Sequence, residues 1–141
     1  QLPASRTDPS LIPTAVEEIL RWTTVTTHFR RTATCDLELG NRTVRSGDKV
    51  VLWWTAADYD DRQFDDPYRF DIQRDPNDHV AFGRNGPHLC IGAWLARMEI
   101  RVTIEELLRR TSEMEIIGPA ERLRSNFISG IKHLPVRFTP A

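Results

Sequence analysis

The apolar and polar positions of this chain predict two helices. The run AVEEILRW after Pro13 has its acids early and Arg21 late, as the helix dipole favours, and predicts a short helix from residue 14. A longer helix is predicted over residues 91–110, where apolar side chains recur at helical spacing and Arg101 stands one turn before Glu105. The apolar stripe expected on this second helix comprises Leu95, Met98, Val102 and Leu108.

Extended segments are predicted between and after these helices. The runs RRTATCDLEL and RTVRSGDKVVLWW favour two strands joined by a hairpin turn at Gly40-Asn41. Residues 58–79 are acidic and rich in turn-forming pairs, which predicts an irregular meander. The side chains expected to pin this meander to a core are Phe64, Tyr68, Phe70 and Ile72. Hairpin-like runs around Gly130 close the chain, so the expected fold class is α+β.

Composition and charge narrow the class of protein. The chain has 141 residues, 40% hydrophobic and 28% charged, with 19 Lys and Arg against 20 Asp and Glu. This length suits one domain over residues 1–141, and the balanced charge gives no reason to expect nucleic acid or an anionic membrane as partner. Two cysteines, Cys35 and Cys90, fit a reducing compartment, so we expect a cytoplasmic protein. The tryptophans expected in the core are Trp53, Trp54 and Trp94.

The segment FGRNGPHLCIGAWLAR, residues 82–97, carries the main chemical signal. Phe82 and Gly83 open a loop, Cys90 stands where this loop becomes a helix, and Gly92 keeps the first turn narrow. Backbone N–H groups at the start of a helix stabilise a thiolate and can tune a metal-bound sulfur. A single cysteine after a glycine loop is about as often a buried inert thiol, so the surrounding residues have to distinguish the two.

The spacing of those residues resembles the haem-binding loop of the cytochromes P450, F-x-x-G-x-x-x-C-x-G followed by a helix containing L-A-R. The matching positions are Gly86, His88, Cys90, Gly92 and Leu95-Ala96-Arg97. The run from Phe82 to Cys90 is one residue longer than the commonest spacing. We interpret this extra residue as a mark of the actinobacterial branch that hydroxylates sterols and branched lipids.

Three further segments resemble motifs of the same family, in the order that the family requires. Glu18-Ile19-Leu20-Arg21 resembles E-x-x-R, whose spacing places both side chains on one helix face. The run Pro67-Tyr68-Arg69-Phe70 resembles P-x-R-F, which implies that Arg69 joins Glu18 and Arg21 in a buried triad. The strand segment that starts at Arg31 resembles the family's sheet motif. Each motif alone also fits an exposed ion pair or a solvated side chain; together and in register they favour the family.

The resemblance implies a haem b cofactor whose iron is bound by the Cys90 thiolate. It implies that Arg31 and His88 contact the haem propionates and that Phe82, Gly83 and Gly92 shape the cofactor site. The residues expected to line a substrate pocket are Thr26, Thr27, Phe29, Phe127 and Ile128. The parent enzyme would hydroxylate an unactivated C–H bond of a sterol or lipid-like substrate with O2 and two electrons. A ferredoxin or similar redox partner is expected on a positive cluster formed by Arg84, Arg97 and Arg101.

The sequence is also compatible with two other functions for this chain. The resemblance covers nearly the whole chain but only the C-terminal third or so of the family's fold, without the helix that activates oxygen. Beyond the haem ligand we therefore expect no catalytic residue and no activity from the isolated chain. One alternative is a non-catalytic haem-binding or electron-transfer module; another is an inactive truncated piece, without haem, that self-associates or needs a missing N-terminal portion. A zinc site is disfavoured, because the histidines and cysteines lack zinc-ligand spacing.

Overall fold

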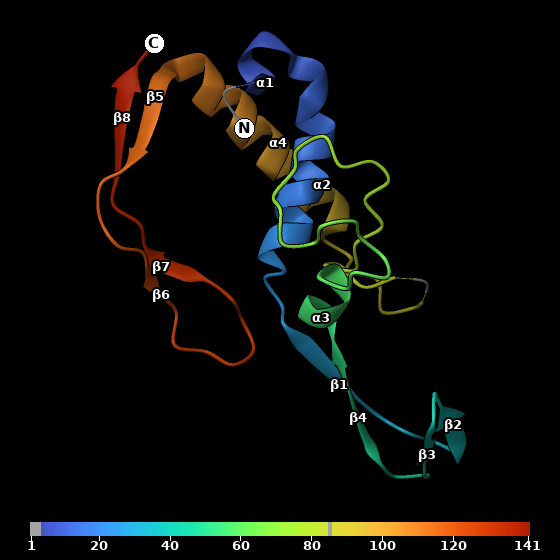
Figure 1. Ribbon diagram of the computed structural model, residues 1–141. Helices are drawn as coiled ribbons and strands as arrows, with labels where there is room; N and C mark the ends of the chain where they lie inside the picture. The colour runs from blue at the N-terminus through green and yellow to red at the C-terminus, as the bar shows by residue number, and fades with distance from the viewer. Residues whose placement is uncertain (1–3, 85) are drawn as a thin grey trace.

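The computed structural model describes residues 4–84 and 86–141 and shows two long helices that lie against each other, with two-stranded β-ribbons leading away from them (Figure 1). The helical elements are α1 (Ala4–Thr7), the 3-10 turn η1 (Pro9–Leu11), α2 (Ile12–Thr23), α3 (Trp54–Asp58) and α4 (Ala93–Arg110). The strands are β1 (His28–Thr32), β2 (Leu37–Leu39), β3 (Arg42–Val44), β4 (Lys49–Trp53), β5 (Thr111–Ile116), β6 (Glu121–Arg122), β7 (Ile131–His133) and β8 (Val136–Pro140). The mixed class predicted from the sequence is confirmed.

The core lies between α2 and the C-terminal half of α4. Ile12, Val16 and Leu20 recur at helical spacing on α2 and pack against Ile104 and Leu108 of α4. Pro13 lies in the first turn of α2, as predicted, where its missing N–H costs no hydrogen bond. Residues 81 and 82, at the base of the cysteine loop, pack against the same cluster. The core therefore supports the loop directly.

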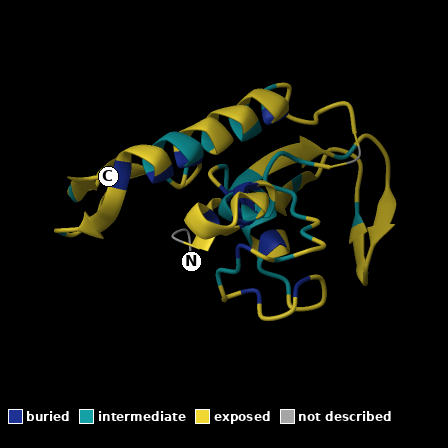
Figure 2. Cartoon of the chain, turned by 90° about the horizontal axis from the view of Figure 1, so that it is seen from above, coloured by how far each residue is buried: buried dark blue, intermediate teal, exposed yellow. Residues whose placement is uncertain are grey.

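The predicted apolar stripe of the long helix is wrong, except at Leu108. Leu95, Met98 and Val102 are exposed, whereas the buried positions of α4 are Ala93, Ile104 and Leu108. The helix has two apolar faces, and α2 packs against the one that contains Ile104 and Leu108. Figure 2 shows exposed segments along the length of α4. The placement of two tryptophans is wrong for a similar reason: Trp94 on the open side of α4 is 81% exposed, and Trp53 on the thin β4 ribbon is exposed too.

The predicted hairpin at Gly40-Asn41 is confirmed, but each expected strand is divided into two. Leu39 of β2 pairs with Arg42 of β3, and Gly40 takes the left-handed φ of 62° that this tight turn requires. The longer β1–β4 pairing forms a separate ribbon. Between the ribbons, the carboxylate of Asp36 accepts a hydrogen bond from the Ser46 N–H, and such local side-chain bonds compete with a regular ladder.

The C-terminal region forms two nested ribbons. β5 pairs with β8 and β6 pairs with β7, so the predicted terminal hairpin is confirmed, although β5 was not expected as its outer strand. The loop between β6 and β7 returns to the segment after α2, where Thr26 and Ile128 form an antiparallel bridge. This return brings residues that are far apart in sequence to one place.

The meander between α3 and the cysteine loop is held by a buried ion pair on α2. Glu18 and Arg21 are both 0% exposed, and the Arg21 Nε donates to Glu18 Oε2 at 2.7 Å. Arg21 also donates to the carbonyls of Asp58 and Pro67, while Glu18 accepts the Asp71 N–H at 2.9 Å. Fixed hydrogen bonds therefore replace regular secondary structure in positioning this segment.

The third arginine of this cluster is Arg74, so the expectation for Arg69 is wrong. The Arg69 side chain is 64% exposed and its guanidinium lies 3.8 Å from Asp71. Arg74 is 10% exposed and donates to Glu18 Oε2 at 3.2 Å. The chain turns at Asp66, whose φ is 48°, and this turn directs the carbonyl of Arg69, rather than its side chain, toward Arg21 and Arg74.

The side chains expected to pin the meander behave differently from one another. Phe64 and Ile72 are buried, as predicted, whereas Tyr68 is 75% exposed and lies against Tyr59, with ring centroids 5.3 Å apart. Among residues 4–84 and 86–141, no helix combines the length and the apolar character needed to span a bilayer.

We expect Glu18→Gln to lower the free energy of unfolding by about 3–5 kcal/mol, because it leaves buried guanidinium groups without their counter-charge. Urea unfolding monitored by tryptophan fluorescence would measure this loss. The matched control is Glu115→Gln, which breaks an exposed pair with Arg137 and should cost no more than about 1 kcal/mol. Equal losses in the two variants would contradict the role assigned to the buried pair.

Candidate functional site

Cys90 lies at the end of a closed loop that leads into α4. The Cys90 N–H donates to the Phe82 carbonyl at 3.0 Å, which joins the two ends of the loop. The Cys90 carbonyl accepts the Ala93 N–H at 3.2 Å as α4 begins. Gly83 has a φ of 74°, a conformation that few residues other than glycine adopt, so the turn after Phe82 depends on it. The backbone thus presents the cysteine at a defined position.

Cys90 is exposed, and so are several large apolar side chains near it in sequence. Cys90 is a free, exposed thiol, and Gly92 is close to it, since a Cβ placed on Gly92 would lie 3.8 Å from the Cys90 Sγ. The large apolar side chains exposed next to it in sequence are Leu89, Ile91, Trp94 and Leu95. Such an exposed apolar surface marks a place where a ligand or another part of a protein binds.

This arrangement fits a haem better than a bare metal ion. Among the described residues, no three His, Cys, Asp or Glu side chains gather into a group able to hold a metal. A structural zinc ion needs four such ligands, whereas haem iron needs only one protein thiolate, because the macrocycle supplies the others. A single exposed cysteine with exposed apolar side chains near it in sequence fits the flat, largely apolar haem.

Beneath the loop, a carboxylate on α2 joins two other segments. Glu17 accepts hydrogen bonds from Arg97 of α4 at 2.7 and 2.9 Å, and His79 Nε2 lies 3.0 Å from Glu17 Oε2. The other ring nitrogen of His79 accepts the Ala81 N–H at 3.2 Å, so the Nε2 carries the proton donated to Glu17. The Arg97 guanidinium lies over the Phe82 ring, 5.0 Å from its centroid.

Two carboxylates around this segment have shifted pKa values. Burial raises the pKa of Glu17, but the hydrogen bonds from His79 and Arg97 and the positive charge of Arg97 outweigh it and bring the pKa to about 2. Burial dominates at Asp58 and raises its pKa, although the carboxylate accepts the Val80 N–H at 2.7 Å and the Thr24 hydroxyl at 2.8 Å. Glu17 is therefore ionised in the folded chain at neutral pH.

The sequence analysis missed several of these contributors. Glu17, His79, Asp58 and Arg74 were not singled out as site residues. Glu17 follows the pattern of an acid that complements the helix dipole, and His79 was considered only as a zinc ligand. The sequence feature that could have indicated Glu17 is its position next to Glu18 on the same helix. Adjacent acids on a helix face in different directions, and here they bind different segments of the chain.

Arg31 and His88, the predicted propionate contacts, are both exposed. Arg31 lies on β1, where its guanidinium donates to the carbonyl of Arg30 at 3.1 Å and sits 5.8 Å from the Phe29 ring centroid. His88 lies in the loop before Cys90, and its carbonyl is near Gly83. Their contacts with a haem stay predictions.

The predicted substrate-pocket residues lie together. The Thr27 N–H donates to the Phe127 carbonyl at 3.0 Å, and the rings of Phe29 and Phe127 meet at a centroid distance of 5.3 Å. Thr26 and Ile128 form the bridge described above. The structure therefore brings together the segment after α2 and the loop between β6 and β7, as the resemblance implies, while their role toward a substrate stays a prediction.

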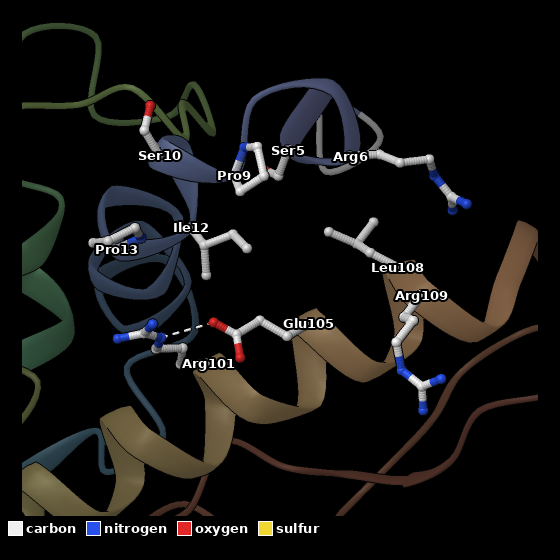
Figure 3. Close-up of a pocket in the computed structure, with 10 residues that line it drawn as sticks. All are labelled: Ser5, Arg6, Pro9, Ser10, Ile12, Pro13, Arg101, Glu105, Leu108 and Arg109. Carbon is white, nitrogen blue, oxygen red and sulfur yellow. Dashed lines mark hydrogen bonds and ion pairs between the residues drawn. The ribbon is translucent and has the colours of Figure 1, made fainter.

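Two cavities lie away from the cysteine. Figure 3 shows the first, of about 450 Å³, between the N-terminal turns and α4. Its lining includes Ser5 and Arg109, and Arg101 pairs with Glu105 at its edge. The second, of about 840 Å³, lies near the end of α2 and includes Thr27 but none of the other predicted pocket residues. Cys90 lines neither cavity.

The arginines of the expected positive cluster each have a carboxylate partner. Arg84 lies 3.2 Å from Asp78, Arg97 binds Glu17, and Arg101 lies 2.8 Å from Glu105. The acids balance much of the positive charge that was predicted beside the cysteine loop. Within this cluster, the Arg101 side chain is 62% exposed and is more accessible than that of Arg97, which is 29% exposed.

Comparison with known proteins gives a consistent result. The family model described as Cytochrome P450 matches residues 5–115. A methyl-branched lipid omega-hydroxylase of Mycobacterium tuberculosis is 48% identical over 92% of this chain and 30% of its own length. A steroid C26-monooxygenase of Mycolicibacterium smegmatis is 44% identical over 91% of this chain and 30% of its own length. This chain thus spans less than a third of either relative.

The solved structures agree with the sequence relatives. The crystal structure of P450 OxyD, which is involved in the biosynthesis of vancomycin-type antibiotics, superposes with a TM-score of 0.93 and 40% identity. The superposition covers 99% of this chain and 36% of that chain. The fold described above is therefore the corresponding part of the P450 fold.

We expect Arg97→Met to destabilise the chain by about 1–2 kcal/mol at neutral pH, because Glu17 loses a charged partner that is partly exposed. A lowered pKa means that ionised Glu17 stabilises the fold fully above about 4.5, and that this stabilisation is lost as pH falls toward about 2. The difference between the variant and the wild type should shrink across this range.

Urea unfolding at a series of pH values would measure this difference. Arg137→Met, which removes an exposed pair with Glu115, is the control and should show a small difference throughout. A difference for Arg97→Met that stays constant down to about pH 2 would refute the assignment of the Glu17 pKa shift to its partners.

Proposed function

The chain belongs to the cytochrome P450 family, and from this we propose that it supplies the haem-thiolate part of a bacterial-type monooxygenase. The reaction is hydroxylation of an unactivated C–H bond of a hydrophobic, sterol- or lipid-like substrate with O2 and two electrons. The observation that carries the proposal is Cys90, an exposed thiol with apolar side chains next to it, on a loop that matches the family motif.

In this proposal the cofactor is haem b and Cys90 is its iron ligand. Haem bound by a cysteine thiolate supplies the oxygen chemistry, because the thiolate pushes electron density that favours O–O cleavage. Arg31 and His88 bind the propionates, and Phe82, Gly83 and Gly92 shape the site. The compartment is the reducing cytoplasm, in agreement with two free cysteines.

The residues of this chain bind, orient and exclude water. The Phe82 carbonyl fixes the Cys90 backbone through its hydrogen bond at 3.0 Å, so the sulfur points from a defined loop. Leu89 and Ile91 are exposed on either side of Cys90 in sequence, and with haem bound they would help to keep water away from the Cys90 sulfur.

The substrate class follows from the wall formed by residues 26–29 and 127–128. Aromatic Phe29 and Phe127 meet there, with Ile128 beside Thr26, so apolar side chains from both segments contribute to this surface. The names of two relatives, a methyl-branched lipid hydroxylase and a steroid monooxygenase, support the same class. We therefore propose that this wall contacts a lipid or sterol-like substrate.

Monooxygenase activity is assigned to the whole protein rather than to these residues alone. The chain spans 30% of the length of the relatives named above. The exposed apolar face of α4, formed by Leu95, Met98 and Val102, is a surface that the remaining part of such a fold would cover. The isolated chain is therefore expected to be inactive toward substrate even if it binds haem.

We expect the chain to take up haem and to give, when reduced under carbon monoxide, the red-shifted absorption band of thiolate ligation. Cys90→Ser should abolish this band. Cys35→Ser is the matched control, because it removes the other exposed free thiol and should leave the band unchanged.

The outcomes separate the alternatives. A thiolate band in the chain, with turnover once the rest of the protein is present, supports the monooxygenase. The same band without turnover by the whole protein would indicate a haem-binding or electron-transfer module. Failure of the whole protein to bind haem, or a band that survives Cys90→Ser, would refute the proposal.

We also propose that an acidic redox partner, such as a ferredoxin, docks beside the cysteine loop and contacts Arg101. Arg101→Glu in the whole protein should slow reduction by the partner on the order of 10-fold at low salt and weaken its salt dependence, because steering by opposite charge is lost. Stopped-flow reduction would measure both quantities.

The control for this docking surface is Arg137→Glu, the same charge reversal at an exposed position on β8. It should leave the reduction rate unchanged. Identical rates for Arg101→Glu and the wild type across the salt range would rule out this docking surface.

A further inference from the structure

Three side chains from three separate segments meet beneath the cysteine loop. Glu17 of α2 binds both Arg97 of α4 and His79 of the meander, and we call these three residues the Glu17 cluster. The His79 side chain is 3% exposed and the other two are about a third exposed, so the cluster lies partly out of water. Its Arg97–Glu17 contact uses two guanidinium nitrogens and both carboxylate oxygens, the geometry that fixes orientation best.

The Glu17 cluster contacts the base of the cysteine loop at two points. The Arg97 guanidinium lies over the Phe82 ring at 5.0 Å, a cation–π contact. The His79 Nδ1 accepts the Ala81 N–H at 3.2 Å, one residue before Phe82. Both contacts restrain the peptide that precedes the loop.

The restrained residue then contacts the cysteine itself. The Phe82 carbonyl accepts the Cys90 N–H at 3.0 Å. A short series of contacts therefore runs from Glu17 through Arg97 to Phe82 and on to the Cys90 backbone. Glu17 is the shared acceptor of the cluster, so its loss releases Arg97 and His79 together.

We infer that Glu17 is a positioning residue for Cys90: its carboxylate holds Arg97 and His79, and these hold the Phe82 peptide that fixes the cysteine backbone. The inference rests on the proposed function in that Cys90 is taken as the haem ligand. Glu17 touches neither Cys90 nor any reacting atom, so its effect on the ligand is indirect.

Amide hydrogen exchange of the 141-residue chain tests this inference without haem. Glu17→Gln should accelerate exchange of the Cys90 amide about 10-fold, since a charged hydrogen-bond acceptor is lost, while amides of the β5–β8 ribbon keep their rates. Glu106→Gln is the matched control: Glu106 also accepts hydrogen bonds from two basic side chains, but on the last turns of α4. It should leave the Cys90 amide unchanged.

A double-mutant cycle tests whether Glu17 acts through Arg97. Arg97→Met alone should also accelerate the Cys90 amide, and adding Glu17→Gln should accelerate it less than in the wild-type background. Arg97→Lys provides a milder variant if Arg97→Met does not fold; it keeps the charge but loses the planar contact with Phe82, and an intermediate rate is expected.

The inference is overturned if Glu17→Gln changes the Cys90 amide no more than Glu106→Gln does. It is also overturned if exchange rises equally in the β5–β8 ribbon, because Glu17 would then serve only global stability, or if the effects of Glu17→Gln and Arg97→Met are additive. Hydrogen exchange of the haem-free chain needs no haem. It therefore tests the role of Glu17 even if the thiolate band is absent and the proposed function is refuted.

A second measurement connects the Glu17 cluster to the ligand. In the haem-loaded protein, Glu17→Gln should reduce the share of the thiolate band in the reduced carbon-monoxide spectrum, and Glu106→Gln should not. A full thiolate band in Glu17→Gln, beside faster exchange of the Cys90 amide, would refute positioning of the ligand while leaving Cys90 as the ligand.

Discussion

The fully buried ion pair between Glu18 and Arg21 is the constraint on which the rest of the structure depends. Two charges removed from water are tolerated only when hydrogen bonds satisfy them, and the meander supplies those bonds through the Asp58 and Pro67 carbonyls and the Asp71 N–H. A segment with little regular secondary structure thereby acquires a defined path, and this path leads to the cysteine loop.

The adjacent acids Glu17 and Glu18 on α2 hold two different parts of the chain. Glu18 faces the meander, while Glu17 faces Arg97 and His79 at the base of the loop. Because both stand on one helix, the path of the meander and the position of the loop are set from the same rigid element. The cysteine is thus supported both by the core between α2 and α4 and by charged contacts at its edge.

The exposed apolar surface of the chain agrees with its place within a larger P450 fold. The uncovered face of α4 and the apolar residues around Cys90 form surfaces that a haem and the rest of such a protein would cover. The buried polar contacts lie around α2 and the meander. Buried polar contacts therefore fix the path of the chain, while its exposed apolar side chains are left for a ligand or for the rest of the protein.

Local sequence patterns alone determined the features that depend on neighbouring residues. These are the first turn of α2 around Pro13, the turn at Gly40-Asn41, the glycine-containing loop before Cys90 and the motifs that identify the family. Tertiary structure alone decided which face of α4 is buried, because both faces are apolar and α2 packs against one of them. It also decided that Arg74, rather than Arg69, reaches Glu18, since the turn at Asp66 directs the Arg69 side chain outward. The role of Glu17 also depended on tertiary structure. Its partners, His79 and Arg97, are distant from it in sequence, and residue spacing does not predict such long-range contacts.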